Sequence, residues 1–160
     1  MSTTDLTHPR ALDDMLLYRL WHVQAAAGRR VVRLCEAEFG ITRREWRVLA
    51  QLALVEGPLS SVLAERAGLD RARTSRAVSS LADKGLLTRK PRPDDRREVR
   101  LHLTDAGRAL YTALLPRVAQ INQELLSVLS DDEVMALEQL LDRLRVQATA
   151  MAALELASSA

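Results

Sequence analysis

The chain has 160 residues, of which 48% are hydrophobic and 3% aromatic, and its formal net charge is +2. Its length fits one domain with or without extended arms, and abundant Ala and Leu with few Gly and Pro indicate a helical protein. No apolar run reaches the ~18 residues of a membrane span, no secretory signal is visible, and one cysteine, Cys35, excludes an internal disulfide framework. We therefore expect a soluble, cytoplasmic protein.

Basic residues are concentrated in one part of the chain. Between Arg71 and Arg100 there are ten Lys or Arg and four Asp or Glu, a net charge of +6, whereas the remainder has 13 basic and 17 acidic residues, a net charge of −4. A basic block in an otherwise acidic protein favours an anionic partner, most often nucleic acid. On charge alone, a merely solvated basic surface is an equal alternative.

Apolar periodicity and breaker residues divide the chain into mostly helical elements. In chain order we predict a flexible arm (1–10), a first helix (11–38), a second helix (41–55), a short helix (60–67), a further helix (71–84), a two-stranded hairpin (86–104), a long helix (105–128) and a last helix from 131 to about 150, followed by a frayed tail (151–160). Pro116 lies inside the long helix, where we expect a kink or a local break.

Capping residues support these boundaries. Thr42 with Glu45, and Ser130 with Glu133, have the spacing of capping boxes. Asp70 can cap the helix that begins at residue 71.

The order helix, helix, tight turn, helix and hairpin is that of a winged helix-turn-helix. In "LAERAGLDRARTSRAVSSLADKGLL", Ala64 is small where two helices cross, and Gly68 permits the sharp turn between them. The predicted fold is mainly α with a small β-hairpin wing. A winged helix-turn-helix DNA-binding domain (41–104) lies between an N-terminal dimerisation helix (11–38) and C-terminal dimerisation helices (105–150).

The helix over 71–84 has two different faces. Thr74, Val78 and Leu81 share one face and must pack inward, although Thr74 also borders the polar face. The opposite face has arginines and small polar residues, which suit close approach to the major groove of DNA. A solvated helix face would more often pair Glu with Lys at i, i+4, and this pairing is absent.

The hairpin tip, "RPDDRRE", is densely charged. Arg is readily inserted into a narrow minor groove, so a tip beside the recognition helix suits DNA, with Asp95 orienting a neighbouring Arg. The alternative is an edge hairpin that charge protects from aggregation. The predicted DNA-binding residues are Arg71, Arg73, Thr74, Ser75, Arg76, Ser79, Asp95, Arg96 and Arg97.

The first helix and the last two are Leu-rich and are not needed to hold a winged helix together. Apolar stripes on terminal helices favour a partner, of which a second copy is the simplest, and a two-fold dimer would present two recognition helices to two half-sites. The alternative is that these helices complete the core of a monomer.

Three stretches in this order resemble the MarR family of transcriptional regulators. They are "ITRREWRVLAQL", "LAERAGLDRARTSRAVSSLADKGLL" and the wing "DDRREVRLHLTDAGR", in which Asp95, Arg97, Leu103, Thr104 and Gly107 match the family's Asp-x-Arg and Leu-Thr-x-x-Gly pattern. The resemblance covers residues 12 to 148. It implies an obligate dimer, a palindromic promoter site, usually repression, and release by a small effector. In many members the effector is an aromatic or phenolic compound, in some a coenzyme A thioester, bound between the dimerisation helices and the DNA-binding lobe.

An anionic aromatic effector needs a cation or donor and an apolar wall. Arg19, His22, Trp46 and Arg47 could supply both, although Trp46 also fits a core anchor and His22 a helix-surface residue. A rival sensor is Cys35, which would make the chain a redox switch. Because nearby Glu36 and Glu38 disfavour a thiolate, a buried and idle cysteine is the preferred interpretation.

Enzyme chemistry finds no support in the sequence. The three histidines, His8, His22 and His102, have no metal-ligand spacing, and there is neither a Gly-rich phosphate loop nor a Gly-x-Ser-x-Gly turn. We expect no catalysis, metal or cofactor, and the partners to be double-stranded DNA, a second copy and a small effector. A protein-docking adaptor that uses the winged helix as its surface is the alternative from another class.

Overall fold

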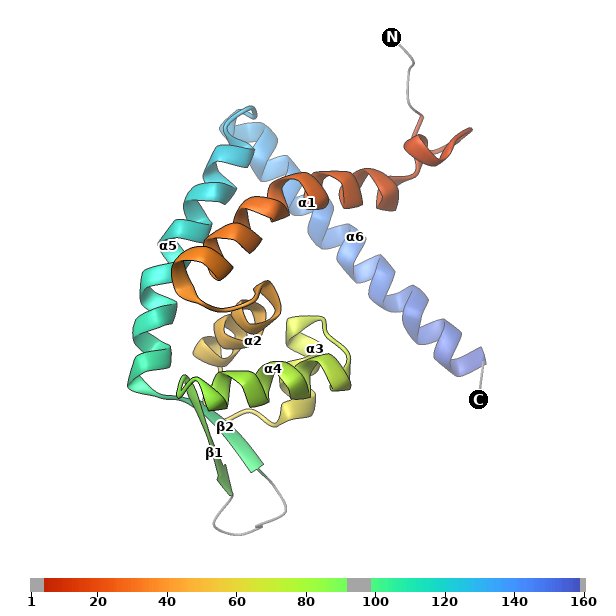
Figure 1. Ribbon diagram of the computed structural model, residues 1–160. Coiled ribbons are helices and arrows are strands. Elements are labelled where there is room, and N and C mark those ends of the chain that lie inside the picture. The colour runs from red at the N-terminus through yellow and green to blue at the C-terminus, as the bar shows by residue number, and fades with distance from the viewer. Residues whose placement is uncertain (1–4, 92–98, 159–160) are drawn as a thin grey trace. The chain divides into compact units, whose positions relative to one another are not determined.

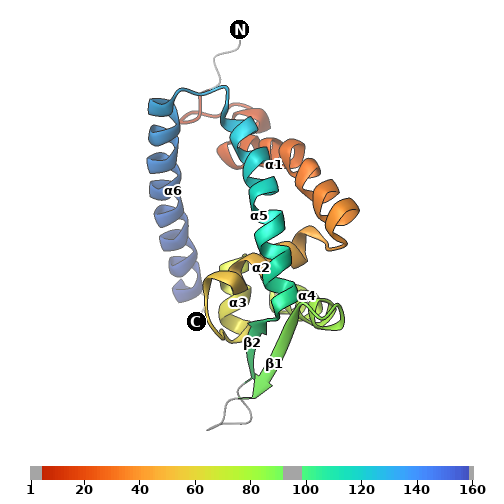
Figure 2. The same cartoon turned by 90° about the vertical axis from the view of Figure 1, so that its left-hand side faces the viewer.

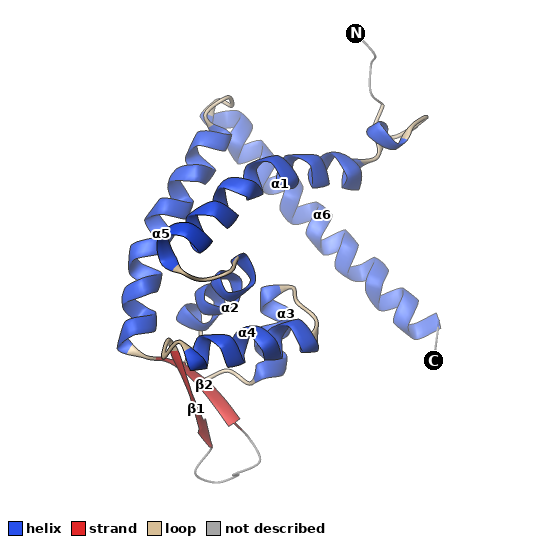
Figure 3. Ribbon diagram, viewed as in Figure 1, coloured by secondary structure: helices blue, strands red, loops and turns tan. Residues whose placement is uncertain are grey.

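The computed structural model describes residues 5–91 and 99–158 (Figure 1). Chain contacts divide it into two units, Met1–Ile121 and Asn122–Ala160, and each is described by itself. The elements are η1 (Leu12–Asp14), α1 (Leu16–Arg33), η2 (Leu34–Glu38), α2 (Arg43–Leu54), α3 (Ser60–Ala67), α4 (Arg71–Asp83), β1 (Leu87–Pro91), β2 (Val99–Leu103), α5 (Asp105–Leu126) and α6 (Asp131–Ser158). Among the described helices, none has the length and apolar content that a membrane crossing requires. The mainly helical fold with one small hairpin confirms the predicted class (Figure 3).

The first predicted helix is divided in the structure. Extended backbone at Met15 separates the single turn η1 from α1. The last five residues form η2, a π-helical turn in which Leu34 and Cys35 are buried. The carbonyl of Cys35 accepts a hydrogen bond from the amide of Ile41 at 3.1 Å, and Gly40 between them has a φ of +64°. A left-handed glycine and a widened final turn thus end the helix, as is common at helix C-termini.

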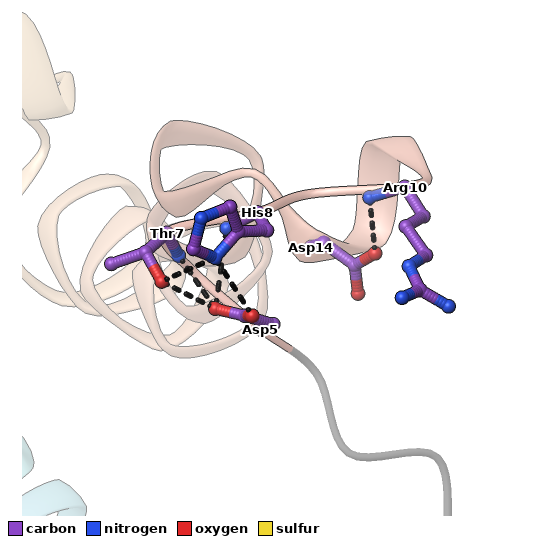
Figure 4. A network of polar contacts seen from close by, with 5 residues as sticks. All are labelled: Asp5, Thr7, His8, Arg10 and Asp14. Atoms are coloured by element: carbon purple, nitrogen blue, oxygen red, sulfur yellow. Dashed lines mark hydrogen bonds and ion pairs between the residues drawn. The ribbon is translucent and has the colours of Figure 1, made fainter.

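The segment before η1 is organised by two aspartates (Figure 4). The carboxylate of Asp5 accepts hydrogen bonds from the amides of Thr7 and His8, at 2.9 and 3.2 Å. Asp14 accepts one from the amide of Arg10 at 2.9 Å. Within the described part of the predicted arm, short-range side-chain bonds therefore define local turns.

The core of the first unit lies among α2, α3, α4 and the hairpin (Figures 1 and 2). The fully buried side chains include Val48 and Leu49 of α2, Leu63 of α3 and Leu81 of α4. The strands pair antiparallel, with Leu87 opposite Leu103 and Pro91 opposite Val99, the buried residues being Leu87, Leu101 and their neighbour Leu86. This arrangement holds α4 between α2 and the hairpin.

An isolated β-bridge joins strand β2 of the hairpin to the loop before α3. Leu59 forms a β-bridge with Arg100, and the amide of Leu101 donates to the carbonyl of Pro58 at 3.2 Å. We did not predict this pairing, because two residues beside a proline give no strand periodicity.

Helix α5 begins where Thr104 joins it to the end of α4. The Thr104 hydroxyl accepts a hydrogen bond from the amide of Gly107 at 3.0 Å and donates to the carbonyl of Gly85 at 2.7 Å. Of the kink or local break that we predicted at Pro116, the break is absent, because the helix is continuous from Asp105 to Leu126. Proline removes one backbone donor, and tertiary packing on either side can compensate for that loss.

The second unit consists of the end of α5, a turn and α6. Its predicted capping box is present: the amide of Ser130 donates to Glu133 at 2.8 Å, and the amide of Glu133 donates to the Ser130 hydroxyl at 3.3 Å. Helix α6 continues to Ser158, past the predicted end of the last helix near residue 150. Alanine and leucine in this stretch have high intrinsic helix propensity, which continues the helix without a regular polar face.

Candidate nucleic-acid interface

The start of α4 is fixed by a cap and a tight turn. Asp70 accepts a hydrogen bond from the amide of Arg73 at 2.7 Å, as predicted for an N-cap. Gly68 has a φ of +59°, which allows the sharp turn between α3 and α4, and its carbonyl accepts from Arg47 at 3.3 Å. These local interactions make the helix-turn-helix.

The inward face of α4 includes one residue of the predicted DNA-binding set. Thr74 is fully buried together with Val78 and Leu81, as the helical angle had suggested. Its hydroxyl donates to the carbonyl of Asp70 at 2.9 Å. The assignment of Thr74 to DNA is therefore corrected: its hydroxyl is committed to the helix backbone and its methyl group to the core.

The outward face of α4 is basic and polar. The side chains of Arg71, Arg73, Ser75 and Arg76 are exposed. Arg73 also forms an ion pair with Asp70 at 3.2 Å, in which both side chains are about half exposed. Such a pair is weak in water and can exchange for a phosphate at little cost. The helix thus presents guanidinium groups and a small hydroxyl on one accessible face.

Ser79 links this face to the wing. Its hydroxyl accepts a hydrogen bond from Arg89 of β1 at 2.8 Å, so the wing strand and α4 are tied together. Arg89 was not in the predicted set, because only the register of the folded hairpin places it beside α4. The predicted tip residues Asp95, Arg96 and Arg97 lie outside the described residues, and their role in the minor groove stays a prediction.

The other end of α4 is held by a partly buried ion pair. Lys84 donates to Glu45 of α2 at 2.8 and 3.0 Å and to the carbonyl of Gly40 at 2.9 Å. Glu45 also completes the predicted capping box with Thr42 and is only 3% exposed. Burial raises the pKa of Glu45, but hydrogen bonds from Lys84, Ser80 and Thr42 outweigh it and leave the pKa below its ordinary value. The carboxylate is therefore charged and fully engaged.

Comparison with known proteins agrees with this geometry. The MarR family model matches residues 39–98, which run from the residue after η2 to the residue before β2. A transcriptional regulatory protein proposed for the hcr operon of Thauera aromatica is 32% identical over 127 residues, covering 79% of this chain and 76% of the relative. A probable transcriptional regulator from Pseudomonas aeruginosa has 31% identity and a TM-score of 0.70, covering 84% of this chain and 99% of that one. The chain belongs to the MarR family.

MarR-family proteins are DNA-binding transcriptional regulators that act as dimers, and they are not enzymes. The expectations of a winged-helix regulator and of no catalysis are thus confirmed. A further structural relative is the PcaV regulator of Streptomyces coelicolor in complex with its natural ligand. It has 30% identity and a TM-score of 0.70, covering 92% of this chain and 99% of that one. Some members of the family therefore bind small molecules.

The four residues predicted for an effector have different surroundings in this MarR-family chain. Trp46 is buried and its ring stacks on Tyr111, with centroids 5.9 Å apart. Arg47 bonds to the α3–α4 turn, and both burial and the neighbouring Arg43 lower its pKa. Arg19 and His22 are exposed on α1. The effector assignment stays a prediction.

The exposed part of α1 has an aromatic cluster. The His22 ring contacts Tyr18 edge-on with centroids 4.5 Å apart and Trp21 with centroids 4.8 Å apart. Trp21 is 54% exposed. We did not include Tyr18 and Trp21 in the predicted effector set, although the i, i+3 spacing of Tyr18 and Trp21 and the i, i+4 spacing of Tyr18 and His22 were visible in the sequence.

Cys35 has the features of a structural cysteine. Its side chain is fully buried in the π-turn. Burial raises the pKa of the thiol; Arg43 opposes this shift and Glu36 adds to it. A buried thiol with a raised pKa is a poor nucleophile, which favours the idle cysteine over the redox switch. In the described segments, no group of three or more His, Cys, Asp or Glu could hold a metal ion.

Proposed function

We propose that this MarR-family regulator is a homodimeric repressor that binds a palindromic promoter site and is released by a small, anionic aromatic effector. The observation that carries the proposal is the exposed face of α4, where Arg71, Arg73 and Arg76 are accessible. Arginine donates two hydrogen bonds to a guanine edge or a phosphate, and a hydroxyl such as that of Ser75 can reach either. Helix α4 is thus a recognition helix, and the wing tip serves the adjacent minor groove.

Exposed apolar residues on both units support the homodimer. In the first unit, Leu17 of α1 is 79% exposed and Trp21 is 54% exposed. In the second unit, Leu140 and Leu154 of α6 are 51% and 69% exposed. Apolar stripes of this kind mark protein–protein contact, and a second copy supplies a self-complementary partner. Two copies place two recognition helices on one palindrome about a helical turn apart.

The effector part of the proposal rests on residues of the first unit. Arg19 and His22 offer a cation and a ring donor on α1, while Trp46 and Arg47 offer an apolar wall and a second cation on α2. An aromatic carboxylate needs both kinds of contact. Release follows if the ligand-bound protein favours a spacing of the recognition helices that does not match the two half-sites.

The testing experiment is binding of the full chain to the DNA upstream of its own gene, compared with a scrambled duplex across a salt series. We expect tight binding to the upstream duplex alone, with a steep negative salt slope and a stoichiometry of two chains per site. Addition of small aromatic acids should weaken the complex. Equal, weak binding to both duplexes would overturn the specific repressor, and no binding at low salt would favour the protein-docking adaptor.

A further inference from the structure

A groove between α2 and α4 adds an arginine from α2 to two arginines of α4. Its volume is about 190 Å³, and it is lined by Thr42, Arg44, Glu45, Arg73, Arg76, Ala77 and Ser80. Two of its arginines come from α4, and the third, Arg44, comes from the first turn of α2. The fold therefore brings together three guanidinium groups from two helices.

The charges in this groove are not balanced by its own acid. Glu45 is the acidic lining residue, and its carboxylate is already occupied by Lys84 and by the amide of Thr42. Arg73 has the solvent-exposed pair with Asp70 described above. Among the described residues, the side chains of Arg44 and Arg76 have neither a hydrogen bond nor an ion pair. The groove consequently has a net positive charge and two uncommitted guanidinium groups.

The size of the groove limits what can occupy it. Pockets for organic ligands usually measure about 300–1,000 Å³, so a groove of about 190 Å³ is too small for an aromatic effector. A phosphate group is small, and guanidinium groups bind phosphate oxygens in pairs through their planar fork. The groove also continues the exposed face of α4, because Arg73 and Arg76 belong to both.

We propose that this groove holds a DNA backbone phosphate at the edge of the major groove that α4 enters, and that Arg44 is a phosphate-binding residue. This inference rests on the proposed DNA-binding function and adds a contact from α2 to it. In a helix-turn-helix the recognition helix reads the bases while neighbouring helices contact the backbone. A phosphate contact fixes the register of the protein on the duplex and does not itself read sequence.

The test compares Arg44→Gln with the parent on the operator and on a scrambled duplex, each across a salt series. Arg44→Gln should weaken binding to both duplexes by a similar factor of about ten. It should also make the slope of log binding constant against log salt concentration less steep by about 0.9 for each phosphate contact that is lost, because one fewer counterion is then released. Arg44→Lys retains the charge and should keep the slope while recovering part of the affinity.

Arg29→Gln is the matched control, because it removes the same charge from an exposed position on α1 outside the groove. It should leave the slope unchanged. The inference is overturned if the parent binds DNA but Arg44→Gln keeps its slope, if Arg44→Gln weakens the operator complex alone, or if Arg29→Gln has the same effect. The inference is also overturned if Arg44→Gln changes the affinity for inorganic phosphate but leaves the salt slope of DNA binding unchanged. A parent that binds neither duplex instead removes the proposed function itself.

Discussion

Lys84→Met should destabilise the protein, because it strands a buried carboxylate. Lys84 donates two hydrogen bonds to Glu45, whose side chain is 4% exposed, and one to the carbonyl of Gly40. Methionine keeps most of the length of the side chain but removes the cation. Breaking a fully buried ion pair costs about 3–5 kcal/mol. The Lys84 side chain is 36% exposed, so water replaces part of the interaction, and we expect a loss of about 2 kcal/mol in the free energy of unfolding.

Urea denaturation followed by far-UV circular dichroism at pH 7 measures this loss. Adding Glu45→Gln to Lys84→Met should recover part of it, because a neutral amide no longer needs the cation. The pKa of Glu45 is lowered in the folded protein, so its contribution is fully present above the ordinary value of 4.5 and is lost as the pH falls through the lower, folded pKa. The difference between parent and Lys84→Met should shrink in that acidic range. A Lys84→Met variant as stable as the parent at pH 7, with no effect of the second substitution, would refute this reasoning.

Three further outcomes follow from particular contacts. Gly107→Ala should cost about 3 kcal/mol or more, since a Cβ there would lie 1.9 Å from the carbonyl oxygen of Leu86; an unchanged melting temperature would contradict the close approach. Thr74→Val should cost about 1 kcal/mol through the lost hydroxyl bond and leave DNA affinity intact, whereas selective loss of operator binding would return Thr74 to the interface. Cys35 should react with a thiol reagent only as fast as the protein unfolds, and DNA binding should resist peroxide; rapid labelling of the native protein would revive the redox switch.

Features that depend on neighbouring residues could be predicted from the sequence. The Thr42–Glu45 and Ser130–Glu133 capping boxes require only a fixed three-residue spacing, and both are present. The N-cap at Asp70 is equally local. The two-residue period of the second strand and the family motifs around it located the hairpin.

Features that depend on residues distant in sequence could not be predicted. The extended backbone at Met15 and the π-turn that buries Cys35 interrupt a sequence whose apolar period is continuous. At Pro116 the sequence predicted a helix break that the structure does not have, because this proline lies within a continuous helix. Arg44 reaches the α4 groove, and Lys84 reaches Glu45, 39 residues away in sequence, only in the folded chain. Neither contact has a spacing that periodicity detects.

The contacts of α4 are unequally distributed along its length, and this bears on how the helix meets DNA. Toward its C-terminal end, Ser79 is bonded to Arg89 of the wing, and Lys84 just beyond the helix is bonded to Glu45. Lys84 also bonds to Gly40, which closes the π-turn at the end of α1. The C-terminal end of α4 is thus held by side-chain contacts to other elements, while the arginines near its N-terminal end are exposed toward solvent. Gly40 lies between η2 and α2, so the ammonium group of Lys84 connects this segment to the C-terminal end of α4.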